Sequence, residues 1–257
     1  MILDRFRLTD KVAVVTGGGR GIGEGCARAF AELGADVVVA SRTSDQIEAV
    51  AKSLRATGRR ALAVPCDVNE RAQLEHLVEV TLSEFGRVDV LVNNAGGSPP
   101  KPALRTSEKM FEAALHFNVT TAFVLSRLVI PHMLEGEGGS IVNISSAAGR
   151  IPQPNFVAYG TAKAALSFMT RQLATELAPQ VRVNAIAVGA VGTSALLPFL
   201  NDDTRGAMEA KTPMRRLGSV EDIAIAALYL ASPASGWVTG KVFEVDGGTE
   251  STNWPFD

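Results

Sequence analysis

Residues 12–23 read VAVVTGGGRGIG, in which a short apolar run passes directly into a glycine-rich turn. Apolar residues at helical spacing follow as far as Leu33, so the segment predicts a strand, a loop and a helix in that order. In such a unit, backbone amides and a helix N-terminus can hold a pyrophosphate. A turn without a ligand is the alternative, but its place between strand and helix favours a dinucleotide held by Gly17, Gly21 and Gly23.

The same alternation continues along the chain. Apolar runs that predict strands lie at 12–15, 36–40, 61–64, 88–92, 140–144, 181–186 and 242–245. Helical patterns lie between them, namely up to Leu33, at 44–57, from an N-cap at Asn69 to Phe85, at 107–133, from Tyr159 onward, and at 220–231. Strands that are apolar on both faces and alternate with helices predict a parallel sheet covered on both sides. With no linker or composition break in 257 residues, we expect one α/β, doubly wound Rossmann-type domain with a seven-stranded parallel sheet.

The composition argues against several classes of protein. A net charge of −2 and a pI near 6.0 give no reason to expect nucleic acid or an anionic membrane as a partner. No run of about 18 uninterrupted apolar residues occurs, and the N-terminus carries an early acid, unlike a signal peptide. We therefore expect a cytoplasmic globular protein.

Cysteine and histidine are too scattered to suggest a metal or redox site. Cys26 and Cys66 lie 40 residues apart, which fits reduced core thiols rather than a redox pair. His76, His116 and His132 lie apart from one another within helical patterns. We expect no metal site.

A second stretch, residues 140–163, joins a buried apolar strand to a helix that begins near Tyr159. Tyr159 and Lys163 are four residues apart and so share one helix face. A free phenol has a pKa near ~10, but a nearby ammonium favours the phenolate. We expect Tyr159 to exchange a proton with a substrate oxygen, Lys163 to lower its pKa, and Ser146 to hydrogen-bond the same oxygen. An ordinary helix pair of tyrosine and lysine is the alternative.

Two arginines lie where a cation is unfavourable unless an anion is bound. Arg20 precedes the first expected helix, and Arg42 precedes the second. Helix dipoles disfavour cations at these N-termini. The acid that binds the ribose 2′-hydroxyl in NAD sites is expected at the end of the second strand, where this chain has Ser41. A hydroxyl followed by an arginine suits a 2′-phosphate, so we expect NADP(H), with solvated surface arginines as the alternative.

With these features in place, the chain resembles the short-chain dehydrogenase/reductase family over essentially its whole length. The motifs that carry the resemblance are Thr16-Gly17-x-x-x-Gly21-Ile22-Gly23, Asp67-Val68, Asn93-Asn94-Ala95-Gly96, Asn118, Ser146, Tyr159-x-x-x-Lys163 and Asp246-Gly247-Gly248. They occur in the family's order. The family's spacing of 13 residues from serine to tyrosine selects Ser146 rather than Ser145.

The resemblance implies a role for each matching residue. Tyr159 would exchange the proton, Ser146 would steady the substrate oxygen, and Lys163 would also hydrogen-bond the nicotinamide ribose. Asn118 would hold a water that extends a proton relay from Lys163. Taken with the two arginines and Ser41, the expected cofactor-binding set is Gly17, Arg20, Gly21, Ile22, Gly23, Ser41, Arg42, Asp67, Val68, Asn94, Ala95, Gly96, Tyr159, Lys163, Gly189, Val191 and Thr193.

One position departs from the family pattern. After the sixth strand the family often has Pro-Gly-x-x-x-Thr, whereas this chain has Val188 before Gly189 and Thr193. The glycine and threonine keep their spacing, so a contact to the carboxamide is expected, and the missing proline predicts a looser loop. We expect the loop-rich stretch 189–212 to be a substrate lid, whose apolar residues at 195–200 suit an apolar substrate or pack on the core.

Three stretches, 94–102, 212–218 and 231–238, resemble the hydroxysteroid dehydrogenases that act at the steroid 7α position. The expected reaction is hydride transfer between NADP(H) and an apolar secondary alcohol or ketone, with a 7α-hydroxysteroid as the first candidate. A 3-oxoacyl thioester (acyl-carrier-protein) reductase is the alternative. A regulatory protein that binds NADP without catalysis is a further one, against which all four catalytic positions are filled.

The resemblance also implies a homotetramer, paired through the helices that contain Tyr159 and Val220. Six apolar residues on these helices exceed what one core face needs, namely Ala165, Leu166, Met169, Ile223, Ala227 and Leu230. Burial within the protomer is the alternative for all six.

Overall fold

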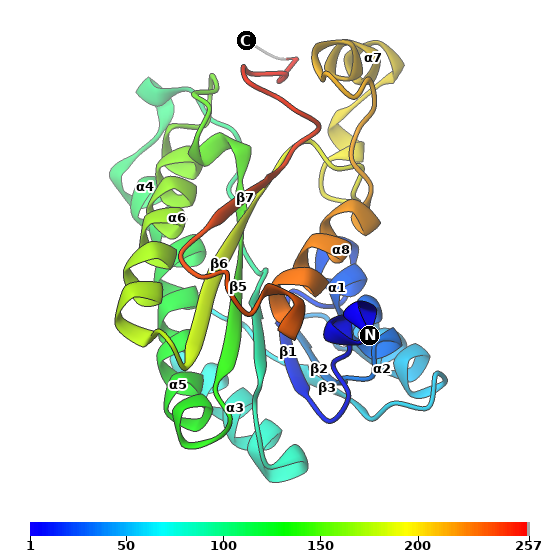
Figure 1. The fold of residues 1–257 in the computed structure, drawn as a ribbon. Coiled ribbons are helices and arrows are strands. Elements are labelled where there is room, and N and C mark those ends of the chain that lie inside the picture. Colours follow the sequence, from blue (N-terminus) through cyan, green and yellow to red (C-terminus); the bar gives the residue numbers. More distant parts are fainter. Residues whose placement is uncertain (256–257) are drawn as a thin grey trace.

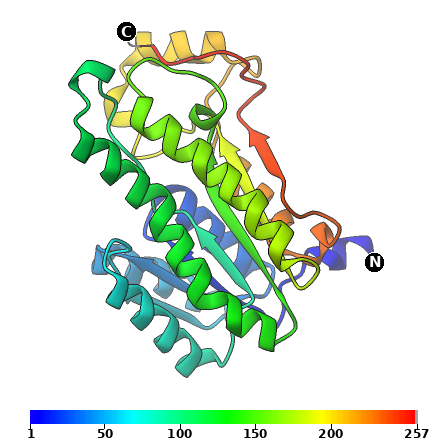
Figure 2. The same cartoon turned by 90° about the vertical axis from the view of Figure 1, so that its left-hand side faces the viewer.

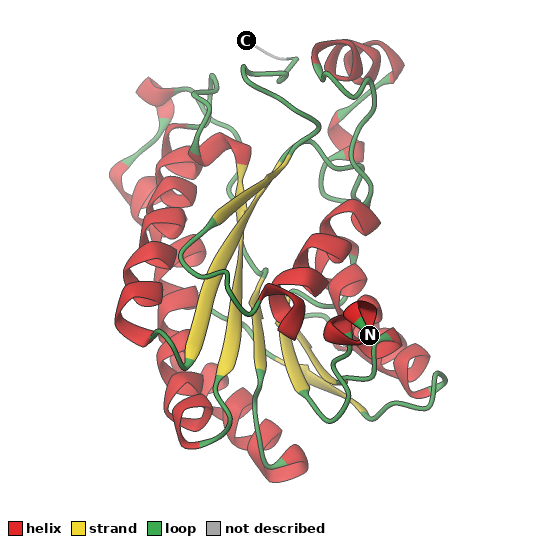
Figure 3. Cartoon of the chain, viewed as in Figure 1, coloured by secondary structure: helices red, strands yellow, loops and turns green. Residues whose placement is uncertain are grey.

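Seven short apolar segments form one parallel sheet in the computed structural model, which describes residues 1–255 (Figures 1 and 3). The strands are β1 (Val12–Thr16), β2 (Asp36–Ser41), β3 (Ala61–Pro65), β4 (Val90–Asn93), β5 (Gly139–Ser146), β6 (Val181–Val188) and β7 (Val242–Val245). Their order across the sheet is β3-β2-β1-β4-β5-β6-β7, and each neighbouring pair is parallel. The expected doubly wound α/β fold is confirmed.

Helices cover both faces of the sheet. They are α1 (Gly21–Glu32), α2 (Ser44–Arg55), α3 (Arg71–Phe85), α4 (Glu108–Leu115), α5 (Thr121–Glu135), α6 (Val157–Leu177), α7 (Asp202–Lys211) and α8 (Val220–Ala231). The core on one face joins the strands to α1, α2 and α8, and the core on the other joins them to α3, α5 and α6. Figure 2 shows the α3, α5 and α6 layer from outside. Both cores are filled because successive strand residues such as Val14 and Val15 point to opposite faces.

Two helix boundaries differ from the expectation, each because a side chain bonds to nearby backbone. Asn69 is not the N-cap of α3, since both its backbone and side-chain nitrogens donate to Asp67 Oδ1 at 3.0 and 2.9 Å, and Glu70 takes the cap position. The helix expected at 107–133 is interrupted by a π-turn, His116–Thr120, between α4 and α5. The Asn118 side chain donates to Ala114 O at 2.8 Å inside this turn.

The stretch expected to be a loop from Gly189 to Thr212 contains a 3₁₀ turn, Leu197–Phe199, and the helix α7. Asn201 caps α7, because its side chain accepts a hydrogen bond from Thr204 N at 2.8 Å. Two acids follow in the first turn. These residues are a helix-start signal that the sequence reading overlooked.

The segment Glu108–Glu135 is long and apolar enough to cross a membrane by those criteria alone. In the fold it is divided into α4, the π-turn and α5, and Leu125, Val129 and Met133 of α5 are buried against the sheet. This packing identifies α5 as a core helix.

Most of the six apolar residues that were expected to face a partner subunit are buried within the protomer instead. Leu166, Ile223, Ala227 and Leu230 are fully buried inside the protomer, and the three residues of α8 belong to the core that joins this helix to the sheet. Ala165 and Met169 are only partly buried. The large apolar residues of these helices that are exposed are instead Val157 and Phe168 on α6 and Ile225 on α8.

Candidate active site

A cavity of about 770 Å³ lies at the carboxyl ends of the strands. The strand order reverses there between β1 and β4, which is where doubly wound sheets bind their ligands. The cavity is lined by all of the expected site residues except two, Gly23 and Asn118. The fold therefore brings these expected residues together in one cavity, although they come from segments spread over most of the chain.

Tyr159 reaches this cavity from the first turn of α6, and Ser146 reaches it from the end of β5. Both residues line the same cavity, and the Ser146 hydroxyl is close enough to act on the pKa of the phenol. The neighbouring Ser145 is buried and bonds to Lys163 O at 3.0 Å and to Ser167 Oγ at 2.8 Å. The Ser145 hydroxyl is thus already engaged with α6, which agrees with the choice of Ser146 as the serine beside Tyr159.

Lys163 lies one turn further along α6 and is buried, with 4% of its surface exposed. Its Nζ donates to Ile144 O at 2.8 Å and lies 5.7 Å from the centre of the Tyr159 ring. Burial lowers the pKa of Lys163 to about 8. The amine is therefore still mostly protonated at neutral pH, close to the phenol.

Burial also affects the phenol of Tyr159. Burial raises the pKa of Tyr159, and the Ser146 hydroxyl opposes this without reversing it. In the protein chain alone burial therefore outweighs the groups that lower the phenol pKa, and the lowering expected from Lys163 stays a prediction. Removal of water from the hydroxyl destabilises the phenolate by more than the surrounding groups stabilise it.

Asn118 does not line the cavity, but its side chain holds the loop after β4, which forms part of the cavity wall. Its Oδ1 accepts from Gly97 N at 2.8 Å, and its Nδ2 donates to Gly97 O at 3.0 Å and to Ala114 O at 2.8 Å. A Cβ atom at Gly96 would lie 2.8 Å from Asn118 Oδ1 and 3.1 Å from Lys163 Nζ, so only glycine fits there. Asn118 thus positions the loop beside Lys163, and the water relay through it stays a prediction.

The glycine-rich turn packs tightly against the loop after β4. Gly17 has a φ of +63°, and a Cβ on Gly23 would lie 2.3 Å from Gly17 O, which excludes any side chain. Asn94 Nδ2 donates to Thr16 O at 2.9 Å and to Gly17 O at 3.2 Å. The first turn of α1 follows directly, and its amide groups have no partners within the helix. This backbone geometry suits a pyrophosphate.

The two arginines line the end of the cavity beyond the glycine-rich turn, together with Ser41, Asp67 and Val68. Arg20 is the residue before α1. The side chain of Arg42 is 70% exposed, and its nearest carboxylate is Asp67, with Nη1 and Oδ2 4.0 Å apart. Both cations are thus free to approach a ligand at this end of the cavity.

The segment after β6 closes the opposite side. A Cβ on Gly189 would lie 2.5 Å from Asp246 Cα, so this position also requires glycine. Val191 pairs with Gly218, and the Thr193 methyl group lies 3.6 Å from where a Cβ on Gly21 would be. The start of the expected lid therefore touches the glycine-rich turn.

Several lining residues were not expected from the sequence. They come from the loop before α6 and from the segment after β7, and they are Gln153, Phe156, Thr249, Asn253 and Trp254. No periodicity or motif marks these positions, because only the tertiary fold brings the C-terminal segment back over the cavity.

Comparisons with known proteins agree with this arrangement. Residues 17–250 match a family model described as Enoyl-(Acyl carrier protein) reductase. The chain is 53% identical over 255 residues to an uncharacterized oxidoreductase of Mycobacterium tuberculosis (strain CDC 1551 / Oshkosh), with 98% of this chain and 97% of that protein covered. It is 41% identical over 246 residues to the 7alpha-hydroxysteroid dehydrogenase of Escherichia coli (strain K12), with 95% and 96% covered. The chain belongs to the short-chain dehydrogenase/reductase family.

A solved member of the short-chain dehydrogenase/reductase family has nearly the same fold. It is a 7 alpha-hydroxysteroid dehydrogenase complexed with NADH and 7-oxo glycochenodeoxycholic acid, with a TM-score of 0.94 and 40% identity, covering 97% of this chain and 98% of that one. The chain is therefore an oxidoreductase of this family, whose members act on alcohols and ketones with a nicotinamide cofactor.

A nicotinamide dinucleotide fits the residues present. The glycine-rich turn and the first turn of α1 would hold the pyrophosphate, and Lys163 would lie at the nicotinamide end. Among residues 1–255, no group of three or more His, Cys, Asp or Glu side chains is arranged to hold a metal ion.

Proposed function

We propose that this short-chain dehydrogenase/reductase interconverts an apolar secondary alcohol and its ketone with NADP(H), and that the substrate is a ring-fused compound of the 7α-hydroxysteroid type. The observation that carries the proposal is the position of Tyr159, Ser146 and Lys163 together in the cavity that also contains the glycine-rich turn. The relationship to a 7alpha-hydroxysteroid dehydrogenase supports the substrate class.

The chain's own residues manage the proton. A bound NADP(H) supplies or accepts the hydride. During oxidation the substrate hydroxyl gives its proton to the Tyr159 oxygen, and during reduction Tyr159 returns a proton to the carbonyl oxygen. Ser146 hydrogen-bonds that same substrate oxygen. Lys163, held by the Ile144 carbonyl, keeps positive charge near the phenol and so stabilises its deprotonated form.

The preference for NADP(H) rests on the residues at the end of β2. Ser41 stands where an acid would bind the ribose 2′-hydroxyl of NAD, and the Arg20 and Arg42 side chains border the same end of the cavity. A 2′-phosphate would be bound by two guanidinium groups that have, among residues 1–255, one carboxylate within ion-pair distance, that of Asp67.

A second candidate has its own support. The matching family model is described as an Enoyl-(Acyl carrier protein) reductase, which favours an acyl thioester as substrate. The same tyrosine and lysine would serve a 3-oxoacyl thioester, because its keto group needs the same proton and hydride. The two candidates differ in the shape of the group beside the reacting carbon.

Initial rates of cofactor reduction test the choice of substrate, steroid or acyl thioester, together with the choice of cofactor, NADP⁺ or NAD⁺. The wild-type protein is assayed with a 7α-hydroxylated bile acid and with a 3-hydroxyacyl thioester, each with NADP⁺ and with NAD⁺. We expect the bile acid with NADP⁺ to be fastest, and Arg42→Ala to raise KM for NADP⁺ about tenfold while leaving KM for NAD⁺ unchanged. Turnover of the thioester alone would move the protein to the acyl branch, and a preference for NAD⁺ would contradict the assignment of Arg42.

Assembly and location complete the proposal. We propose a homotetramer in the cytoplasm. Phe168 on α6 and Ile225 on α8, with 57% and 65% of their surfaces exposed, support contacts between subunits along these helices. Cys26 and Cys66 are free thiols, as expected in a reducing compartment.

A further inference from the structure

The C-terminal segment after β7 returns over the cavity that contains Tyr159. Thr249, Asn253 and Trp254 all line that cavity. Figure 1 shows this segment leaving β7 and running past the carboxyl ends of the strands toward α7. The family motifs end at Gly248, so nothing in them gives this segment a role.

Two anchors hold the segment in place. Arg150, four residues after Ser146, pairs with Asp246 at 3.0 Å and with Glu250 at 2.9 Å, and it donates to Thr249 O at 2.7 Å. Asn253 Nδ2 donates to Thr212 Oγ1 at 3.0 Å, and both residues are buried. The segment is thus fixed at one end to the loop after β5 and at the other to the end of α7.

Between the anchors and the phenol lies a row of three aromatic rings. The ring centres of Trp254 and Phe156 are 5.0 Å apart at 90°, and those of Phe156 and Tyr159 are 5.9 Å apart at 60°. These are favourable edge-to-face arrangements that fix the ring positions. The row extends from the phenol along the cavity wall, because all three residues line the same cavity.

We propose that Phe156 and Trp254 form the wall of the subsite that selects a rigid ring system attached to the reacting carbon, and that Arg150 positions this wall. The inference rests on the proposed function and names the part of the site that sets its substrate class. Fixed aromatic faces contact a rigid ring over a large area without ordering many bonds. A flexible chain must give up rotational freedom to make the same contact, so the wall favours rings over chains.

Kinetics with two ten-carbon ketones test this selection. The rigid trans-1-decalone and the flexible 2-decanone are reduced by the wild type, by Trp254→Ala and by Trp254→Phe. We expect Trp254→Ala to raise KM for decalone about tenfold and KM for 2-decanone less than about threefold, with kcat nearly unchanged. Trp254→Phe restores most of the loss. Equal effects on both ketones, or no effect on either, would overturn the proposal.

Arg150 is tested as a positioning residue by the same split between KM and kcat. Arg150→Gln should raise KM for decalone in the same direction as Trp254→Ala but by less. Arg71→Gln is the matched control, because Arg71 pairs with Glu75 on the same helix and does not line the cavity. A fall in kcat for both ketones in Arg150→Gln would show a general effect on the fold and contradict the positioning role.

A binding measurement separates this inference from the proposed function. The chain has two tryptophans, and Trp237 is fully exposed on the surface, so Trp237→Phe leaves Trp254 as the only indole emitter. Decalone added with NADP⁺ should protect Trp254 from acrylamide quenching in a saturable manner. Should the wild type reduce no ketone with either cofactor, the proposed function fails. Protection of Trp254 by decalone would then still support the proposal that Phe156 and Trp254 form a ring-binding wall. Absence of protection would overturn that proposal as well.

Discussion

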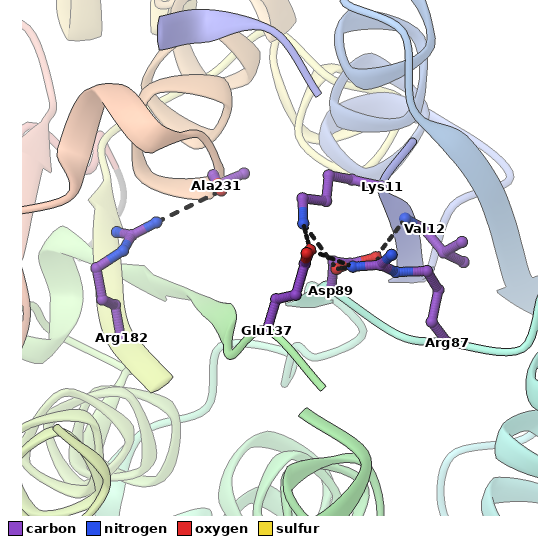
Figure 4. Close-up of polar contacts among 7 residues, drawn as sticks. All are labelled: Lys11, Val12, Arg87, Asp89, Glu137, Arg182 and Ala231. Carbon is purple, nitrogen blue, oxygen red and sulfur yellow. Dashed lines mark hydrogen bonds and ion pairs between the residues drawn. The ribbon is translucent and has the colours of Figure 1, made fainter. Parts of the chain in front are cut away.

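The charged groups at the two ends of the parallel strands differ in their partners. We call the end where the strands begin the amino edge of the sheet, and the end where they finish the carboxyl edge. At the amino edge, Asp89 is buried, accepts from Val12 N at 2.9 Å, and pairs with Arg87 at 2.6 Å and with Lys11 at 3.4 Å (Figure 4). Glu137 completes the group at 2.7 Å from Lys11 and 3.0 Å from Arg87. At the carboxyl edge, the buried Lys163 has one carbonyl oxygen as its hydrogen-bond partner and no carboxylate in contact among the described residues.

Figure 4 also contains a partly buried cation at the amino edge that has no carboxylate partner among the described residues. Arg182 donates to Ser235 Oγ at 2.7 Å, to Ser232 O at 3.2 Å and to Ala231 O at 3.4 Å. These carbonyl groups end α8, where the helix dipole is negative. Burial lowers the pKa of Arg182, but an arginine stays charged, so this group serves the fold.

The comparison separates charges that stabilise the fold from charges prepared for chemistry. The amino edge pairs its charges with one another or with a helix end. The carboxyl edge leaves an amine and a phenol with pKa values shifted by burial, which is typical of reactive sites. Changes at the carboxyl edge should therefore affect turnover, and changes at the amino edge should affect stability.

The largest effect is expected for Tyr159→Phe. Removing the hydroxyl leaves no group to exchange the proton, so kcat should fall by roughly 10³-fold while the dissociation constant of NADPH changes little. Tyr229→Phe is the matched control, because this other tyrosine packs against Phe6 and Phe243, away from the cavity. Stopped-flow turnover and NADPH fluorescence titration measure the two quantities. Retained turnover in Tyr159→Phe would exclude the mechanism.

The next largest effect is expected at the amino edge. Asp89→Ala leaves the Arg87 and Lys11 cations without their buried partner and Val12 N without its acceptor. The free energy of unfolding should fall by about 3 kcal/mol, while kcat of the folded enzyme stays unchanged. Urea unfolding and steady-state kinetics on one preparation measure both. Glu137→Gln, at the exposed end of the group, should cost much less, and a large loss of kcat in Asp89→Ala would show that the two edges are coupled.

The sequence predicted the features that depend on local pattern. Strands β1 and β2 were predicted to within one residue at each end, because buried runs such as VAVV have no other stable environment. The sequence also predicted that Tyr159, Lys163 and Ser146 lie in one site. The four-residue helix spacing places Tyr159 and Lys163 on one face, and Ser146 lies at the end of the preceding strand. The structure leaves the catalytic roles, the cofactor preference and the tetramer as predictions.

The features that the sequence did not predict depend on contacts between distant segments. The π-turn forms around Asn118, whose side chain bonds to Gly97, a residue 21 positions earlier. Trp254 reaches the cavity because the fold returns the C-terminus to Phe156. The effect of burial on the pKa of Tyr159 could not be predicted, because burial is a property of the packed site and cannot be read from a pair of residues.

The smallest effect expected is a dependence of the free energy of unfolding on pH. It should occur in an alkaline range for the carboxyl edge and in an acidic range for the amino edge. Lys163 has a pKa of about 8 in the folded protein against an ordinary 10.5, so between these values the unfolded chain binds more protons than the folded one. The free energy of unfolding of the wild type should therefore rise with pH in this window relative to Lys163→Met, by about 2 kcal/mol. Below pH 8 the difference should be flat.

Glu137, at the amino edge, should make stability depend on pH in the acidic range. Hydrogen bonds from Lys11 and Arg87 lower its pKa from 4.5 to about 2, so the stability that it adds is present above 4.5 and is lost as the pH falls toward 2. Urea unfolding of the wild type, Lys163→Met and Glu137→Gln at pH 3, 7 and 10 measures both ranges, with Lys109→Met as the control for an exposed lysine. A constant difference between wild type and Lys163→Met from pH 7 to 10 would mean that Lys163 is charged throughout, and the contrast between the edges would then lie in their partners alone.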